Sequence, residues 1–219
     1  MGRAYHGHLM SADTIEHLQA RSRRSAEQIL RAAVQVITRQ GIHDFTMSAV
    51  SDAAGISIGG VYGRYPNKEA LLRAVKDEVL TGLETDVQRQ LDAADPGSRA
   101  LLGAFTHVVS NAFAESSGLY AFIFIHSAQD AAMKARGFAF HQRVKGLLQE
   151  RLLDHGVTDQ TGVDVAYDMI MQSLLMRVIS MGNVPDGEVP YAGFPDPDLY
   201  AREIVLAVDA YVAQRSRPA

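Results

Sequence analysis

A hydrophobic period of three and four residues runs almost without a break from Ser25 to about residue 215. Apolar side chains at this spacing lie on one face of an α-helix, so the pattern predicts a succession of amphipathic helices. Glycine and proline breaks divide it into expected helices over residues 25–40, 46–55, 57–65, 67–95, 98–115, 119–130, 132–155, 160–182 and 197–215. Leu119 to Ile125 alone has the composition of a strand, but no second run of that kind exists to pair with it. The sequence therefore predicts an all-α fold.

The chain divides into three parts by composition and helix length. Residues 1–24 have little hydrophobic period and end in the basic cluster Arg21-Ser-Arg-Arg24, which predicts a flexible basic arm. Residues 25–70 hold three short helices and predict a small domain, whereas residues 71–219 predict a larger helical domain. The glycine- and proline-rich stretch from Pro185 to Pro197 fits either a flap over a pocket mouth or part of an interface between subunits.

Composition excludes several classes of protein. The chain contains no cysteine, so disulfides, thiolate chemistry and cysteine-based zinc sites are ruled out, and we expect a reducing cytoplasm as its compartment. The longest apolar run, Leu119 to Ile125, is far shorter than the roughly 20 residues that a membrane span requires. No apolar core of a signal peptide follows the basic residues at the N-terminus. We therefore expect no membrane partner.

The charge is unevenly distributed along the chain. The formal net charge is -4, but residues 1–68 hold eight Lys and Arg against five acidic residues, a net charge of +3. Residues 69–219 hold 13 basic and 20 acidic residues, a net charge of -7. A basic N-terminal third on an acidic body indicates an anionic partner at one end, with chance clustering on a solvated surface as the alternative.

Two short helices are expected on either side of the turn Ala54-Gly55-Ile56-Ser57. A glycine-containing turn between two short helices is typical of a helix-turn-helix, in which the first helix braces the second and the second enters the major groove of DNA. The glycines of residues 55–63 also suggest a phosphate-binding loop. That alternative lacks both the Gly-Lys-Ser/Thr ending and a preceding strand.

Residues 45–72 resemble the signature of the TetR family of transcriptional regulators in order and spacing. The anchors are the Ala-Gly-Ile-Ser turn, Tyr62, the pair Tyr65-Pro66 and the run Lys68-Glu-Ala-Leu-Leu72. The resemblance implies an N-terminal three-helix helix-turn-helix DNA-binding domain, over residues 25–70 here. It also implies that the larger C-terminal helical domain binds an effector and forms the dimer.

The resemblance also carries DNA contacts over to individual residues. Hydroxyls and an ammonium group stand at positions that bind phosphate in the family, and both groups can donate hydrogen bonds to phosphate oxygens. The arginines of the N-terminal arm extend the basic surface. Few side chains remain for base readout, so we expect close backbone approach at the glycines and apolar contact with a thymine methyl group. The expected DNA-binding residues are Arg23, Arg24, Thr46, Ser48, Ser57, Ile58, Gly59, Gly60, Tyr62, Arg64 and Lys68.

Helices 160–182 and 197–215 are apolar on more than one face, as is typical of helices buried on all sides. We expect these two helices to pair with their copies across a two-fold axis, as the resemblance implies; the alternative is the core of a monomer. The expected interface residues are Tyr167, Ile170, Leu174, Val178, Ile204, Val208, Tyr211 and Val212.

The C-terminal part is also rich in aromatic, thioether and histidine side chains, which suit an adaptable apolar pocket. The expected pocket residues are Phe105, His107, Phe113, Phe122, His126, Phe140, His141, Met169 and Met176. For each of them ordinary core packing is the alternative. A metal site formed by three of the histidines is a further alternative, but no pair at i and i+4 supports it, so we expect no metal and no cofactor.

The sequence favours a ligand-responsive homodimeric DNA-binding transcriptional regulator. We expect a repressor that binds double-stranded DNA at a palindromic operator and is released by a small, largely apolar effector. The alternatives are a small helical enzyme and a nonspecific DNA-binding or scaffold protein. Because the chain has no cysteine, no His-Glu-x-x-His motif and no carboxylate-rich pair of helices, we expect that it is not an enzyme.

Overall fold

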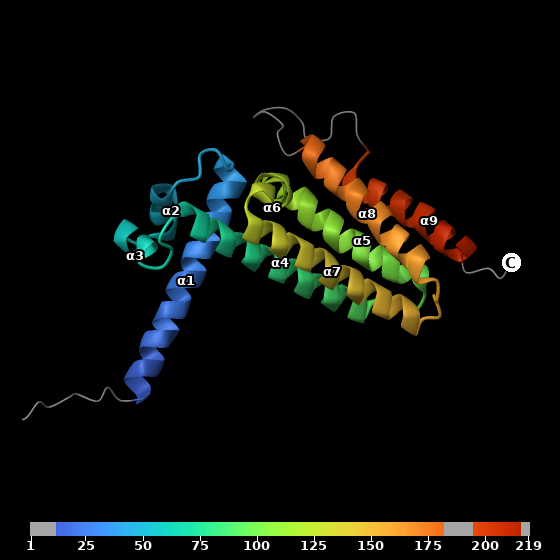
Figure 1. Ribbon diagram of the computed structural model, residues 1–219, viewed down its shortest axis with the longest axis horizontal. Coiled ribbons are helices and arrows are strands. Elements are labelled where there is room, and N and C mark those ends of the chain that lie inside the picture. Colours follow the sequence, from blue (N-terminus) through green and yellow to red (C-terminus); the bar gives the residue numbers. More distant parts are fainter. Residues whose placement is uncertain (1–11, 182–194, 216–219) are drawn as a thin grey trace, which may run out of the picture.

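The computed structural model describes residues 12–181 and 195–215, and the all-α fold is confirmed over them (Figure 1). The elements are α1 (Ala12–Gln40), α2 (Met47–Ala54), α3 (Ile58–Tyr62), α4 (Lys68–Ala93), α5 (Ser98–Glu115), α6 (Ser117–Phe124), the 3₁₀ helix η1 (His126–Gln129), α7 (Ala131–Asp154), α8 (Gln160–Met181) and α9 (Pro197–Arg215). Most of the stretch from Pro185 to Pro197 lies outside the described residues. None of the described helices is long and apolar enough to cross a membrane.

Helix α1 begins much earlier than the sequence predicts. It starts at Ala12, so Ser25 lies within the helix rather than at its start, and residues 12–24 are helical rather than a flexible arm. Once a helix has formed, each added residue with good helix propensity extends it at little cost, even without an apolar face. Figure 1 shows that the first half of α1 projects away from the rest of the structure.

Local capping sets the starts of the three helices that follow. The Thr46 hydroxyl accepts a hydrogen bond from the Ala49 amide at 3.0 Å, and the Ser57 hydroxyl accepts one from the Gly60 amide at 3.2 Å. Asn67 does the same at the start of α4. Gly55 ends α2 in the left-handed region with a φ of 63°. These caps confirm the predicted starts of the helices, because each joins a side chain to the backbone amide three residues later. The third helix ends at Tyr62 rather than near Tyr65 as predicted.

The C-terminal helices form a layered bundle. Helix α4 runs out of the N-terminal domain and lies along α7, while α5 packs between this pair and the outer pair of α8 and α9 (Figure 1). The expected helix 119–130 is instead the short helix α6 followed by η1. Buried apolar side chains from α1 to α9 belong to a single continuous cluster, so the two parts of the chain share one core.

Helix α4 connects the N-terminal domain to the bundle through two lysines. Lys68, in its first turn, donates from Nζ to the Phe45 carbonyl at 2.7 Å. Two turns later the buried Lys76 donates to the Ile123 carbonyl and the Ser127 hydroxyl, at 2.8 Å and 2.7 Å. Burial lowers the pKa of Lys76 to about 8. The same helix is therefore hydrogen-bonded to the entrance of α2 and to the end of α6.

Candidate nucleic-acid interface and effector cavity

Helix α3 presents its larger side chains to solvent. Val61 is fully buried and fixes the helix against the core, whereas Ile58 is 43% exposed and Tyr62 is 49% exposed. Thr46 and Ser48, at the start of α2, are also exposed. Exposed apolar side chains on α3 and exposed hydroxyls at the start of α2 are suited to contact with a partner.

The turn between α2 and α3 is held from two sides. Gln28 of α1 donates from Nε2 to the Ala54 carbonyl at 2.6 Å, and the Ser51 hydroxyl donates to the Ile56 carbonyl at 2.7 Å. These bonds satisfy the carbonyl of the last residue of α2, which the helix itself leaves unpaired, and a carbonyl in the turn. They fix the angle at which α3 leaves α2, and therefore the direction in which Tyr62 points.

Several predicted DNA-binding residues already have structural roles. Thr46 and Ser57 cap α2 and α3, but a hydroxyl that accepts a hydrogen bond still has its own proton to donate. Lys68 is half-buried, with its ammonium 5.5 Å from the centre of the Phe45 ring. Arg64 donates from Nη2 to the Ser22 hydroxyl at 2.6 Å. The fold therefore holds Arg64 against α1 and Lys68 against the residue that precedes Thr46.

Arg23 and Arg24 are exposed on α1 and point in different directions. Residues four apart lie on the same side of a helix, so Arg24 shares the side of Gln28, which contacts the turn between α2 and α3. Arg23 is rotated about 100° from Arg24, further from that side. Arg24 therefore lies on the side of α1 that faces the helix-turn-helix, and Arg23 lies further round the helix.

The two glycines of α3 differ in what surrounds them. A Cβ at Gly60 would lie 2.9 Å from Cγ2 of Ile56 and 3.3 Å from the Ser57 Oγ, so packing within the chain requires glycine there. A Cβ at Gly59 would meet nothing within 4 Å. Nothing within the chain requires glycine at position 59, although glycine costs a helix roughly 0.5–1 kcal/mol relative to alanine.

Residues 55–59 also read Gly-Ile-Ser-Ile-Gly, which matches the Gly-x-Ser-x-Gly pattern of serine hydrolases. In those enzymes the serine lies on a sharp turn from a strand into a helix. Here the segment follows helix α2, and the Ser57 hydroxyl caps α3. The match therefore lacks the structural context of a nucleophile.

Residues 29–75, from the middle of α1 to the first turns of α4, match the family model of bacterial regulatory proteins of the tetR family. The N-terminal domain is a TetR-family domain. The match includes α2 and α3, so the helix-turn-helix is part of what the family model recognises.

Solved structures extend the similarity to most of the chain. The fatty acid degradation regulator FadR from Bacillus halodurans is 20% identical, with a TM-score of 0.66 over 84% of this chain and 94% of its own. FadR from Bacillus subtilis, solved with stearoyl-CoA, is 17% identical, with a TM-score of 0.65 over 83% and 96%. PfmR from Thermus thermophilus, a TetR-family regulator, is 19% identical, with a TM-score of 0.61 over 82% and 96%. These similarities show that the chain shares the fold of these regulators.

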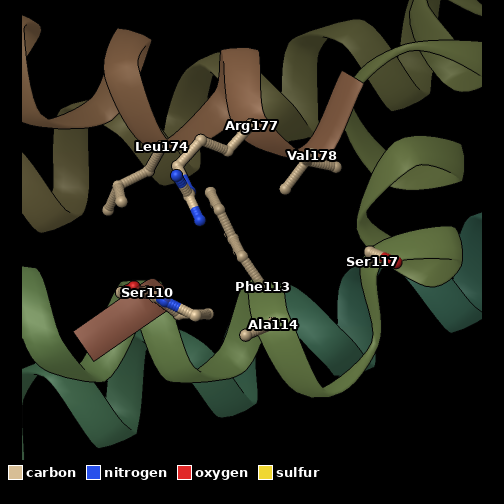
Figure 2. A pocket seen from close by; sticks show the side chains of 8 residues that line it. Ser110, Phe113, Ala114, Ser117, Leu174, Arg177 and Val178 are labelled. Carbon is tan, nitrogen blue, oxygen red and sulfur yellow. The ribbon is translucent and has the colours of Figure 1, made fainter. Parts of the chain in front are cut away.

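The C-terminal domain contains a small cavity of about 20 Å³ between α5, the start of α6, α8 and the start of α9. Figure 2 shows Arg177 and Phe113 reaching into it from α8 and α5. The described residues that line it are Ser110, Phe113, Ala114, Ser117, Leu174, Arg177, Val178 and Pro197. A more open hollow of about 460 Å³ shares Arg177, and its described lining is Gln172, Ser173, Met176, Arg177, Ser180, Pro195 and Tyr200.

Of the predicted pocket residues, Phe113 lines the cavity and Met176 lines the hollow. The other seven lie elsewhere, because helix packing turns their side chains into the core or toward other surfaces. Phe105, Phe122 and Phe140 are buried in the core; His107 lines a polar groove between α4 and α5; and Met169 is exposed on α8.

The remaining two predicted pocket residues, His126 and His141, have ring partners of their own. His126 makes an edge contact with His43, with ring centres 5.9 Å apart. His141 lies 2.8 Å from the Tyr167 hydroxyl, and burial lowers the pKa of its imidazole. Among the described residues no three histidines or carboxylates are placed to hold a metal ion.

The predicted dimer interface is wrong in most of its residues. Tyr167, Ile170, Leu174 and Val178 form the inward stripe of α8, and Val208 and Val212 face inward from α9; all six are buried within one subunit. Ile204 and Tyr211 are partly buried. The exposed apolar residues of the two helices are instead Val165, Met169, Met176, Ile179, Leu199 and Leu206.

Proposed function

We propose that the chain is a ligand-responsive, homodimeric DNA-binding regulator that represses transcription from a palindromic operator. The observation that carries the proposal is the exposure of the TetR-family helix-turn-helix, where Ile58 and Tyr62 of α3 and the hydroxyl residues Thr46 and Ser48 of α2 all face solvent. Hydroxyls at the start of α2 suit phosphate contacts, and α3 suits the major groove. Lys68 supplies a cation beside them.

Selection of bound duplexes from random DNA tests this proposal. A palindromic consensus is expected, with half-sites roughly 34 Å apart along the helix axis. Tyr62→Ala should weaken binding to the selected duplex by about tenfold or more, because the phenol is exposed and contacts DNA rather than the core. Phe138→Ala is the matched control, since Phe138 is 66% exposed on α7. Enrichment of no sequence, or equal loss in both variants, would overturn the proposal.

The dimer interface that we propose is the outward stripe of α8 and α9. Val165, Met169, Met176 and Ile179 recur at four-, seven- and three-residue spacing along α8, so they lie on one face. A second copy placed on this face across a two-fold axis would form a four-helix interface. Sedimentation of Met169→Glu should show monomers, while Phe138→Glu on α7 should remain dimeric. A wild-type protein that sediments as a monomer at micromolar concentration would refute this proposed interface.

For the effector we propose the space around Arg177, made of the cavity between α5, α6, α8 and α9 and the adjoining hollow. It is walled by Phe113, Leu174 and Val178, which suits a largely apolar ligand. The structure of Bacillus subtilis FadR with stearoyl-CoA supports a ligand-binding role for a domain of this fold. A ligand that prefers a different domain arrangement from DNA must weaken DNA binding, and DNA must weaken ligand binding by the same factor.

A further inference from the structure

The first half of α1 is a feature of this chain that the family signature does not include. Residues 12–28 are helical but precede the segment, residues 29–75, that matches the family model. Figure 1 shows this half of α1 leaving the structure at the end that carries α2 and α3, away from the C-terminal bundle. Gln19 and residues 21–24 are exposed. This part of the helix is therefore available to a partner.

Two hydrogen bonds fix the direction of α1 relative to the helix-turn-helix. Arg64, two residues after the end of α3, donates from Nη2 to the Ser22 hydroxyl at 2.6 Å. Gln28 donates to the Ala54 carbonyl at the end of α2, also at 2.6 Å. Residues 12–22 extend the helix about 15 Å beyond the contact with Arg64, at 1.5 Å per residue. The extension therefore starts from a point that is attached to the end of α3.

The surface of this extension is basic and almost without apolar groups. Residues 19–24 read Gln-Ala-Arg-Ser-Arg-Arg, three arginines without an acidic residue. The next acidic side chain along α1, Glu27, already forms an ion pair with Arg31 at 3.8 Å. No apolar side chain in residues 19–24 is larger than alanine, which argues against a protein partner that buries apolar area. Exposed guanidinium groups of this density suit a polyanion.

Helical geometry directs the three arginines differently. Arg21 precedes Gln28 by seven residues, so the two side chains are rotated by only about 20° from each other. Arg21 thus points between Gln28 and Ser22, the two side chains through which α1 contacts the helix-turn-helix. Arg23 is rotated about 140° from Gln28 and about 100° from Ser22, so it points away. Arg21 is the arginine that faces the side of α1 on which α2 and α3 lie.

We propose that the first half of α1 is a rigid DNA-binding helix that contacts phosphates flanking each half-site, with Arg21 as its principal cation. This rests on the proposed function, because it extends the same DNA surface from α3 along α1. When Tyr62 lies against DNA, the bond between Arg64 and Ser22 brings α1 to the same duplex.

The dimensions and the chemistry agree with a contact outside the half-site. An extension of about 15 Å spans roughly four base pairs, since successive phosphates of one strand are about 3.4 Å apart along the axis. A guanidinium donates two parallel hydrogen bonds to the oxygens of one phosphate. Such contacts carry no sequence information, so they add affinity for any flanking sequence.

Duplexes of two lengths test the inference with the full-length protein at one fixed salt concentration. The short duplex ends at the outer edges of the selected palindrome, and the long duplex adds about six base pairs on each side, enough to cover the extension. By fluorescence anisotropy, the wild type should bind the long duplex about tenfold or more tightly, whatever the flanking sequence. Equal affinity for both lengths would overturn this inference and leave the proposed function intact. Binding to neither length would overturn both.

Three arginine variants of α1 separate a fixed helix from general positive charge. Arg21→Ala should lose most of the gain on the long duplex and change little on the short one. Arg23→Ala should lose less of the gain, because its side chain points away. Arg39→Ala is the matched control, since it removes the same charge from an exposed residue in the last turn of α1 and should keep the gain. If Arg21→Ala loses no more than either of the other two variants, the inference is wrong.

Ser22→Pro tests the helix itself. Proline keeps every arginine but removes a backbone donor and clashes with the preceding turn, so it breaks or kinks the helix at this point. The gain on the long duplex should fall as far as in Arg21→Ala, while binding to the short duplex shows that the helix-turn-helix is folded. A gain that survives in Ser22→Pro would mean that a flexible basic arm suffices, and the rigid helix would be refuted.

Discussion

Gly59→Ala should make the protein more stable and its DNA binding weaker. A Cβ at this position meets nothing within 4 Å, and the backbone of Gly59 is helical, so alanine introduces no clash. Alanine in a helix is roughly 0.5–1 kcal/mol more favourable than glycine. For a chain of this size that gain corresponds to a rise in melting temperature of about 1–4 °C.

Gly60→Ala is the matched variant, one residue away in the same helix. Its Cβ would lie 2.9 Å from Cγ2 of Ile56, whereas two such carbons are best placed about 3.5–4.0 Å apart. Overpacking of this kind costs about 1–3 kcal/mol, which exceeds the gain in helix propensity. The melting temperature should therefore fall, measured at the same protein concentration as the wild type because subunit association shifts it.

DNA binding tests why position 59 is glycine. If the backbone of α3 closely approaches the major groove there, the added methyl group should weaken binding to the selected duplex by about 1 kcal/mol or more, as judged by fluorescence anisotropy. The expected pattern for Gly59→Ala is greater stability with weaker binding. If Gly60→Ala is more stable than Gly59→Ala, the packing argument is wrong. If Gly59→Ala binds DNA with unchanged affinity, the backbone of α3 does not closely approach the groove at position 59.

Three polar side chains with little exposure provide further tests. Thr106→Val should stabilise the protein by about 1 kcal/mol, because the buried Thr106 hydroxyl has no hydrogen-bond partner among the described residues; a lower melting temperature would contradict this. Burial lowers the pKa of Lys76 to about 8 from 10.5, so the unfolded chain binds that proton more tightly. The free energy of unfolding, from urea titrations, should therefore rise between about pH 8 and pH 10.5, and Lys76→Met should lack this rise. Lys68→Met should lower the free energy of unfolding by about 1 kcal/mol, because the hydrogen bond to the Phe45 carbonyl is lost. It should also reduce the slope of log Kd for DNA against log salt concentration by about 1, and an unchanged slope would exclude a phosphate contact.

The parts of the fold that depend on short-range chemistry were predictable from the sequence. Thr46, Ser57 and Asn67 cap helices because each is followed three residues later by an amide within reach of its side chain. Gly41 and Gly55 end helices with φ of 79° and 63°, a conformation that glycine adopts without strain. These signals lie within the sequence itself and do not depend on what packs around them.

The extension of α1 was not predictable from hydrophobic period. Residues 12–24 are mostly polar or basic, and a period of apolar residues reports burial rather than helicity. The available signal was propensity, because Ala, Glu, Gln, Leu and Arg dominate this stretch. Helix propensity is a weak signal on its own. It predicts a helix here only because the buried helix from Ile29 onward is already formed and can be extended toward the N-terminus.

The burial of Arg177 is not predictable from the sequence, because the sequence does not show which way the side chain points. An arginine in a long helix is normally exposed, and Leu174 and Val178 beside it were assigned to a dimer interface. The structure places all three on the inward face of α8, against α5 and the start of α9. Only this packing turns a surface charge into a buried cation on a cavity wall.

The interface residues predicted from the sequence are mostly wrong for a physical reason, and the same reason provides a test. Helix α8 carries two apolar stripes on opposite faces, one through Leu174 and one through Met169, and sequence alone does not say which faces the core. Packing of α5, α6 and α7 against α8 decides it. A charge on the inward stripe must be buried, so Leu174→Glu should unfold the subunit, whereas Met169→Glu should leave it folded and separate the dimer. Circular dichroism and sedimentation of the two variants distinguish these outcomes, and a folded monomer from Leu174→Glu would reverse the assignment of the stripes.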